Sequence, residues 1–149
     1  MITNKKLKEV LLNRNVIDKK TLETNEKKAE NKGQSLADYL INKNLASEEI
    51  IYESMAKEFN IPFVDLKDQV IRKDILSLIP EPIVQVHNVV AFEKSDQGLK
   101  IACLDPEDLQ TFEFIEKKTG LKPIIHLTTP SSIKSALKQY HKGLKAEFK

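Results

Sequence analysis

An internal repeat near the start of the sequence limits most strongly what this chain can fold into. When the sequence is shifted by about 29 positions, residues 7–18 align with residues 36–47. The identical positions are Leu7, Leu11, Asn13 and Asn15, which recur as Leu36, Leu40, Asn42 and Asn44. The repeat predicts one structural unit that occurs twice.

Each copy is predicted to be a helix, a tight asparagine turn and a second, capped helix. In the second copy, residues 36–43 carry apolar side chains at helical spacing. Asn44 suits a left-handed position at the helix end, where asparagine commonly replaces glycine. Ser47 suits the N-cap of the next helix, whose apolar stripe is expected to include Ile50, Ile51 and Met55.

The first copy follows the same plan with a weaker second helix. Asp18 suits the N-cap, and the helix runs from about Lys19 to Lys32. Glu26 stands where the second copy has Met55. We therefore predict that this helix packs only near Leu22.

Beyond Asn60 the pattern predicts a small sheet. The segment 61–66 is expected to be extended, because Pro62 disfavours helix at the residue before it. Residues 89–92 and 99–103 are typical of a β-hairpin, and residues 123–127 of a third strand.

Three further helices are predicted around these strands. The first covers residues 74–79 and ends at Pro80-Glu81-Pro82. The second begins with Asp105 as cap and Pro106 at the first helical position, and its apolar side is expected to include Leu109. The last begins near Thr129-Pro130. The predicted fold class is α+β, with a repeat of helix pairs in residues 1–60 and a small three-stranded sheet packed with helices in residues 61–149.

The balance of charge argues against nucleic-acid binding. The chain has 24 Lys and Arg against 22 Asp and Glu, a net charge of +2, whereas nucleic-acid binding usually requires a basic face. Only the C-terminal end is basic, through Lys134, Lys138, Lys142, Lys145 and Lys149 against Glu147. Cations near the end of a helix already have a structural explanation in the helix dipole.

The sequence also predicts a cytoplasmic protein without a membrane span. No run approaches the ~20 apolar residues that a spanning helix needs, and no signal peptide is recognisable at the N-terminus. The single cysteine, Cys103, cannot form an internal disulfide, which favours a reducing compartment.

No motif predicts catalysis, a metal site or a cofactor. The sequence has no phosphate-binding P-loop, and its three histidines are too dispersed to aim two rings at one metal. Cys103 is expected to be a small buried residue, and His126 a structural residue of its strand. Asp105 and Asp108 could hold a metal, but a helix capping box explains their spacing fully.

Several segments together resemble one family. The run 59–66, Phe-Asn-Ile-Pro-Phe-Val-Asp-Leu, resembles the "L-G-V-P-F-V-D-L" ending found in the N-terminal domain of type II secretion and type IV pilus assembly ATPases. The run 101–109, Ile-Ala-Cys-Leu-Asp-Pro-Glu-Asp-Leu, is similar to the family's "V-A-x-x-D-P-x-D-L". Ile79-Pro80, Thr119-Gly120 and the helix from Ile133 to Tyr140 match in order and spacing.

The resemblance implies that residues 1–149 form a regulatory or docking module. In the family, the hexameric motor lies C-terminal to this module, which connects it to inner-membrane platform or assembly proteins. We therefore expect a non-catalytic chain without a cofactor, held at the inner membrane through protein partners. Whether it is a fragment joined to a motor or a freestanding copy stays open.

One branch of the family binds cyclic di-GMP through a tandem motif, which implies an alternative function. Each half of the motif begins "R-L-G", has a glycine at the helix–helix turn and ends in glutamine. The matching runs here are Lys6-Leu7-Lys8 with Asn15 and Ala29, and Ser35-Leu36-Ala37 with Asn44 and Glu58. The leucines are retained and the other motif residues are replaced, so helix packing is the favoured interpretation. If the alternative holds, the binding residues would be Lys6, Leu7, Leu11, Asn15, Leu36, Leu40 and Asn44.

The helical first half has the more exposed charged faces. A partner surface is therefore expected there, around residues 19–32. An ordinary solvated face is the alternative interpretation of the same charges.

Overall fold

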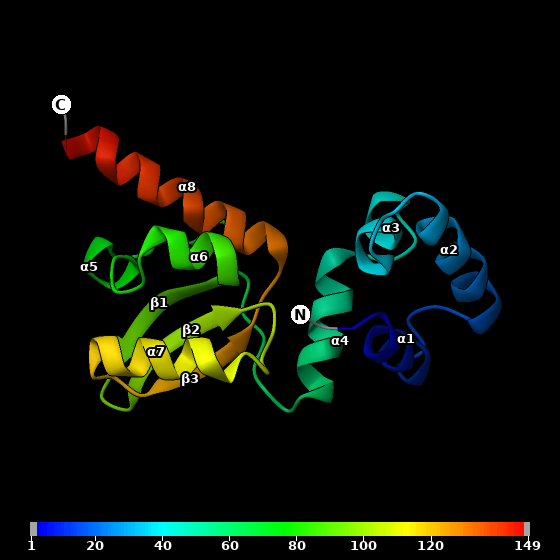
Figure 1. The fold of residues 1–149 in the computed structure, drawn as a ribbon, viewed down its shortest axis with the longest axis horizontal. Helices are drawn as coiled ribbons and strands as arrows, with labels where there is room; N and C mark the ends of the chain where they lie inside the picture. The colour runs from blue at the N-terminus through cyan, green and yellow to red at the C-terminus, as the bar shows by residue number, and fades with distance from the viewer. Residues whose placement is uncertain (1–2, 148–149) are drawn as a thin grey trace. The chain divides into compact units, whose positions relative to one another are not determined.

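The protein consists of two compact units in a computed structural model that describes residues 3–147, with side chains as far as His141. The first unit ends at Asn60 and the second begins at Ile61. Over residues 3–147 the chain forms eight helices and one three-stranded sheet (Figure 1). The predicted α+β fold class is confirmed.

The first unit contains the four helices of the repeat, α1 (Asn4–Asn13), α2 (Lys19–Asn31), α3 (Leu36–Asn42) and α4 (Glu48–Glu58). The predicted caps are confirmed. Asp18 Oδ1 accepts a hydrogen bond from the Thr21 amide at 2.7 Å, and Ser47 Oγ accepts one from the Ile50 amide at 3.1 Å. Both bonds satisfy donors that the first helical turn leaves free.

The helices of this unit share one core. α1 packs against α3 and α4, and α2 packs against α3. The largest side chains that are fully buried here are Leu11, Leu22, Leu36, Leu40, Ile51 and Met55.

Two predictions about burial in this unit are wrong. Contacts of α2 continue past Leu22, since Asn25 and Ala29 are buried as well. Asn25 is tolerated there because its Nδ2 donates to the Thr21 carbonyl at 2.7 Å. Ile50, expected on the apolar stripe of α4, is 50 % exposed.

The sheet of the second unit has the order β1–β2–β3, formed by Val89–Ser95, Gly98–Cys103 and Pro123–Leu127. All three predicted strands are confirmed. β1 and β2 are antiparallel with a bulge between Ala91 and Glu93, and β2 and β3 are parallel. The extended segment after Pro62 is also confirmed, because Phe63 forms a parallel bridge with Leu127.

The helices of the second unit are α5 (Lys73–Leu76), α6 (Glu81–His87), α7 (Leu109–Thr119) and α8 (Pro130–Glu147). The predicted helix 74–79 is shorter, and Pro80-Glu81-Pro82 opens α6 instead of ending a helix. Proline is compatible with a first helical turn because its missing amide would have no partner there. α7 begins three residues later than expected, and Leu109 is 65 % exposed.

α8 holds the segment that precedes the sheet. Buried Ser132 Oγ accepts a hydrogen bond from the Leu66 amide at 2.9 Å, and Gln139 Oε1 accepts one from the Ile71 amide at 2.9 Å. Tyr140 donates its hydroxyl to the carbonyls of Leu76 and Ile79. These contacts supply partners to backbone groups in a stretch with little secondary structure.

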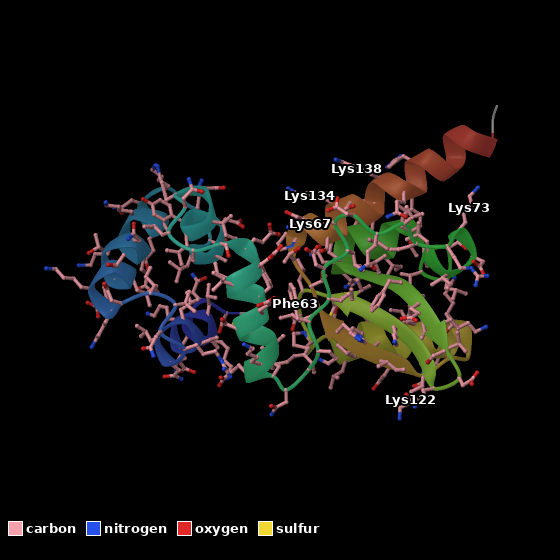
Figure 2. The ribbon with its side chains drawn as sticks, turned by 180° about the vertical axis from the view of Figure 1, so that it is seen from behind. Phe63, Lys67, Lys73, Lys122, Lys134 and Lys138 are labelled. Carbon is pink, nitrogen blue, oxygen red and sulfur yellow. The ribbon has the colours of Figure 1, made fainter. Side chains whose placement is uncertain are left out.

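The exposed side of α8 carries the first lysines of the basic C-terminal end. Lys134 and Lys138 are exposed one helical turn apart, as labelled in Figure 2. Lys142, Lys145, Lys149 and Glu147 lie outside the side chains that the structure describes. Within residues 3–147, no helix combines the length and apolar character needed to cross a bilayer.

Candidate functional site

Two matched turns in the helical unit border a concave surface. Asn15, two residues after α1, is in the left-handed conformation at φ 55°, and Asn44, two residues after α3, is so at φ 58°. The next amides, of Val16 and Leu45, each donate at 2.9 Å to a carbonyl five residues earlier. This Schellman closure turns the chain sharply between the two helices of each copy, and confirms the left-handed position predicted for Asn44.

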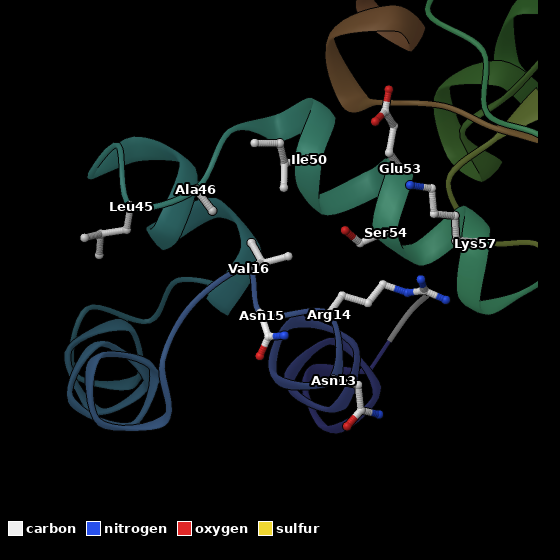
Figure 3. Close-up of a pocket in the computed structure, with 10 residues that line it drawn as sticks. All are labelled: Asn13, Arg14, Asn15, Val16, Leu45, Ala46, Ile50, Glu53, Ser54 and Lys57. Atoms are coloured by element: carbon white, nitrogen blue, oxygen red, sulfur yellow. The ribbon is translucent and has the colours of Figure 1, made fainter.

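A groove of about 590 Å³ opens between these turns and α4 (Figure 3). We call it the turn–α4 groove. Its lining includes Asn13, Arg14, Asn15, Val16, Leu45, Ala46, Ile50, Glu53, Ser54 and Lys57. In Figure 3 the apolar side chains gather toward one end and the charged ones toward the other.

The charges at the polar end have different surroundings. Arg14 Nη2 lies 3.5 Å from Glu58 Oε2, and Lys6 Nζ lies 3.8 Å from Glu58 Oε1. Among the described residues, neither Lys57 nor Glu53 forms an ion pair. Lys57 therefore lines the turn–α4 groove without an ion-pair partner among the described residues.

The residues of the tandem motif do not form one accessible cluster. The side chains of Leu7, Leu11, Leu36 and Leu40 are at most 5 % exposed, because they pack between the helices. Lys6 lies beside Glu58 and also stands 5.6 Å from the centre of the Phe59 ring. Asn15 lines the turn–α4 groove, while Asn44 serves as the equivalent turn residue. Their assignment as a ligand site remains a prediction.

Asp105 and Asp108, expected to form a capping box, make other contacts. Asp105 Oδ1 accepts from the Glu107 amide at 2.9 Å in a tight turn, and the side chain of Asp108 caps no amide of α7. Instead, Asp108 Oδ2 lies 3.5 Å from His87 Nδ1, which also contacts Thr111 Oγ1 at 3.2 Å. In the described part of the chain, no group of three or more potential metal ligands comes together.

Cys103 and His126 both lie in the sheet. Cys103 is buried, as predicted, and burial followed by the charges of Asp105 and Asp108 raises the pKa of its thiol to about 12. The His126 ring packs edge-on against Phe92 with centroids 5.1 Å apart. Both residues therefore have packing contacts that account for their positions.

The turn–α4 groove was not predicted from the sequence. Its recognisable signal was a difference between the two copies, since Ile50 of α4 aligns with Thr21 of α2. The charged surface expected around residues 19–32 is present as the exposed lysines of α2, and none of its residues lines the turn–α4 groove.

Comparison with known proteins identifies curated relatives of much greater length. The chain is 23 % identical over 136 residues to the type IV pilus assembly ATPase PilB of Myxococcus xanthus, covering 91 % of this chain and 24 % of the relative. It is 27 % identical over 145 residues to PilB of Thermus thermophilus, covering 96 % of this chain and 16 % of the relative. The chain thus spans less than a quarter of the length of these relatives.

Solved structures share the fold. A structure of MshE with cdg, cyclic di-GMP, superposes with a TM-score of 0.70 at 22 % identity, covering 90 % of this chain and 97 % of that one. The N-terminal domain of XpsE superposes with a TM-score of 0.64 at 19 % identity, covering 93 % and 96 % of the two chains.

The family model of the MshEN domain matches residues 59–147, which include the whole sheet and α5 to α8. More than half of the chain is therefore accounted for by one family. The chain belongs to the MshEN domain family, the N-terminal domain of type IV pilus assembly and type II secretion ATPases.

Proposed function

We propose that this chain is a non-catalytic docking module of a secretion or pilus ATPase, and that it binds the cytoplasmic part of an inner-membrane platform protein. The observation that carries the proposal is the MshEN match over residues 59–147, combined with curated relatives that are pilus assembly ATPases. Because the relatives are at least four times longer than the matched part, the motor is assigned to their remaining sequence. The module is then cytoplasmic and reaches the membrane through its partner.

In this proposal residues 1–149 act as one module with two sub-regions. The helical repeat of residues 1–60 provides the contact surface, and the α+β unit of residues 61–149 provides the family scaffold. The distribution of observed features supports this division, since the turn–α4 groove lies in the first sub-region and the family match lies almost wholly in the second.

The direct experiment is calorimetric titration of the folded chain with the purified cytoplasmic domain of the cognate platform protein. We expect saturable binding with one site per chain. A chain with intact circular dichroism that shows no binding would exclude the docking function. Hydrolysis of ATP by the chain alone would contradict its assignment as a non-catalytic module.

Cyclic di-GMP binding is the second candidate, favoured by the shared fold with MshE, which was solved with this ligand. The residues in question are Lys6, Leu7, Leu11, Asn15, Leu36, Leu40 and Asn44. Burial of the four leucines and the carboxylate of Glu58 beside Lys6 favour docking over this alternative. Calorimetry at ~100 µM cyclic di-GMP separates the two, because silence there limits the binding free energy to less than about 5.5 kcal/mol.

A further inference from the structure

The exposed apolar side chains of the helical unit gather in one place. Over its described residues, the large apolar side chains that remain exposed are Leu45 at 38 % and Ile50 at 50 %. Both line the turn–α4 groove, together with Val16 and Ala46. Single exposed leucines are common on protein surfaces, whereas two that line the same concavity indicate a contact surface.

The internal repeat shows that the fold does not require an apolar residue at position 50. α2 and α4 are equivalent helices, each capped at its N-terminus and each burying the matching residues Leu22 and Ile51. At the position of Ile50, however, α2 carries Thr21. Because α2 forms with threonine at this position, neither helix formation nor core packing explains why α4 has an exposed isoleucine.

The neighbouring charges specify what can approach this apolar surface. Lys57 lies on the same helix as Ile50, two turns further on, and has no ion-pair partner among the described residues. Arg14 adds a second cation at the same end, partly neutralised by Glu58. Glu53, one helical turn before Lys57, also lines the groove, so the lining charges of Arg14, Lys57 and Glu53 sum to a small positive excess.

We propose that the turn–α4 groove binds an amphipathic helix of the partner protein. Two apolar side chains one helical turn apart would contact Leu45 and Ile50, and an acidic side chain beyond them would pair with Lys57. A helix presents side chains at i and i+4 on one face, which matches a groove that is apolar at one end and cationic at the other. This inference rests on the proposed docking function and names the surface that performs it.

The test uses the complete chain and the cytoplasmic domain of the cognate platform protein as the probe. Calorimetry compares Ile50→Thr and Lys57→Glu with two matched controls. Val70→Thr alters an apolar side chain that is 94 % exposed outside the groove, and Lys134→Glu alters an exposed lysine of α8, outside the helical unit. Amide chemical shifts of the labelled chain locate the contact.

We expect Ile50→Thr to weaken binding by about tenfold, as truncation of a central interface side chain typically does. Lys57→Glu should weaken binding by about fivefold at low salt and less at high salt, because exposed charges are screened. Both controls should bind like the wild type. Shifts on binding should centre on residues 45–57.

The remaining outcomes separate the two proposals. Binding that Ile50→Thr and Lys57→Glu leave unchanged, or shifts centred elsewhere, would overturn the groove assignment and keep the docking function. Absence of binding by the wild-type chain would overturn both. Concentration-dependent shifts of the chain alone at residues 45–57 would assign the groove to a second copy, and shifts there with cyclic di-GMP would assign it to that ligand.

Discussion

Single asparagine residues turn the chain after four of its helices. Asn15, Asn44, Asn60 and Asn88 all adopt the left-handed conformation, with φ between 53° and 58°. Asparagine tolerates this region because its short polar side chain can bond locally. These positions end helices α1, α3, α4 and α6, so each turn is fixed by one residue.

Among Gly33, Gly98 and Gly120, the glycines that the structure describes, Gly98 is the one where an added side chain would clash. It starts β2 with φ +147°, and an added Cβ would lie 2.1 Å from the Lys122 carbonyl oxygen. Gly98→Ala should lower the free energy of unfolding by about 3 kcal/mol, as strained and overpacked sites do. Urea denaturation followed by circular dichroism measures the change.

Gly33→Ala is the matched control for this clash. Gly33 has φ +67° with no atom within 4 Å of an added Cβ. Only the strain of the left-handed backbone remains, at about 1 kcal/mol. Equal losses for the two variants would show that the Lys122 carbonyl does not limit position 98.

Burial of Cys103 predicts how stability depends on alkaline pH. Its pKa is raised from 9.0 to about 12 in the folded chain, so the unfolded thiol ionises first. The stability that the buried thiol contributes is full below pH 9.0 and is lost as pH rises toward about 12. Denaturation midpoints of the wild type and Cys103→Ala should therefore converge over this window. A constant difference up to pH 12 would contradict the assignment.

At the scale of elements, the sequence predicts the helices, strands and caps that depend on residues close together in the chain. The strands follow from apolar runs between turn residues, and the caps at Asp18 and Ser47 follow from hydrogen bonds within one turn. The failures at Pro80–Pro82 and Asp105 have a different cause. Proline and aspartate are suited to both turns and helix starts, so tertiary contacts decide which one forms.

The same reasoning explains why the candidate site could be predicted only in part. The turns that border the turn–α4 groove follow from Asn15 and Asn44. Ile50, by contrast, fits the apolar periodicity of α4 and is nevertheless half exposed. Whether a periodic apolar residue faces a core or a groove depends on neighbouring helices, which the spacing within one helix does not encode.

The Ser47 cap tests the stability of α4, the helix that contributes four of the ten residues lining the groove. Ser47→Ala removes the 3.1 Å hydrogen bond to the Ile50 amide and should lower the free energy of unfolding by about 1 kcal/mol. Ser47→Asp retains an acceptor and should remain close to the wild type. Thermal unfolding of both variants checks the difference, and a loss common to both would argue against capping as its source.

Ser132 tests how α8 holds the segment after Pro62. Its hydroxyl is fully buried and accepts from the Leu66 amide at 2.9 Å. Ser132→Ala leaves that amide without its partner, which should cost about 2 kcal/mol. Urea denaturation measures this, with the exposed Ser77→Ala as control. A cost below that of the control would mean that another acceptor replaces the hydroxyl.

At the scale of the whole molecule, each unit contains its own buried residues. The core of the second unit, from Leu66 to Ala136, includes side chains of β1, β2 and α5 to α8, and the partly buried Ile125 of β3 packs against it. The first unit buries Leu7 through Ala56 among its four helices. Each unit therefore satisfies the usual physical condition for folding on its own.

Separate expression of residues 1–60 and 61–149 tests this expectation. Amide spectra of the two fragments should together reproduce most resonances of the complete chain, apart from those next to the cut. The fragment 1–60 is small, so we expect it to be the less stable of the two. Collapsed, poorly dispersed spectra for residues 61–149 would show that its core needs the helical unit.

The parallel bridge of Phe63 to Leu127 has a consequence for biosynthesis. Its neighbouring hydrogen bond, from Thr128 Oγ1 to the Val64 carbonyl, joins residues 64 positions apart. On the ribosome, the helical repeat can complete its local contacts while Val64 still awaits a partner that has not been translated. The segment after Asn60 thus lacks this partner until β3 has been translated, and the sheet can close only after that point.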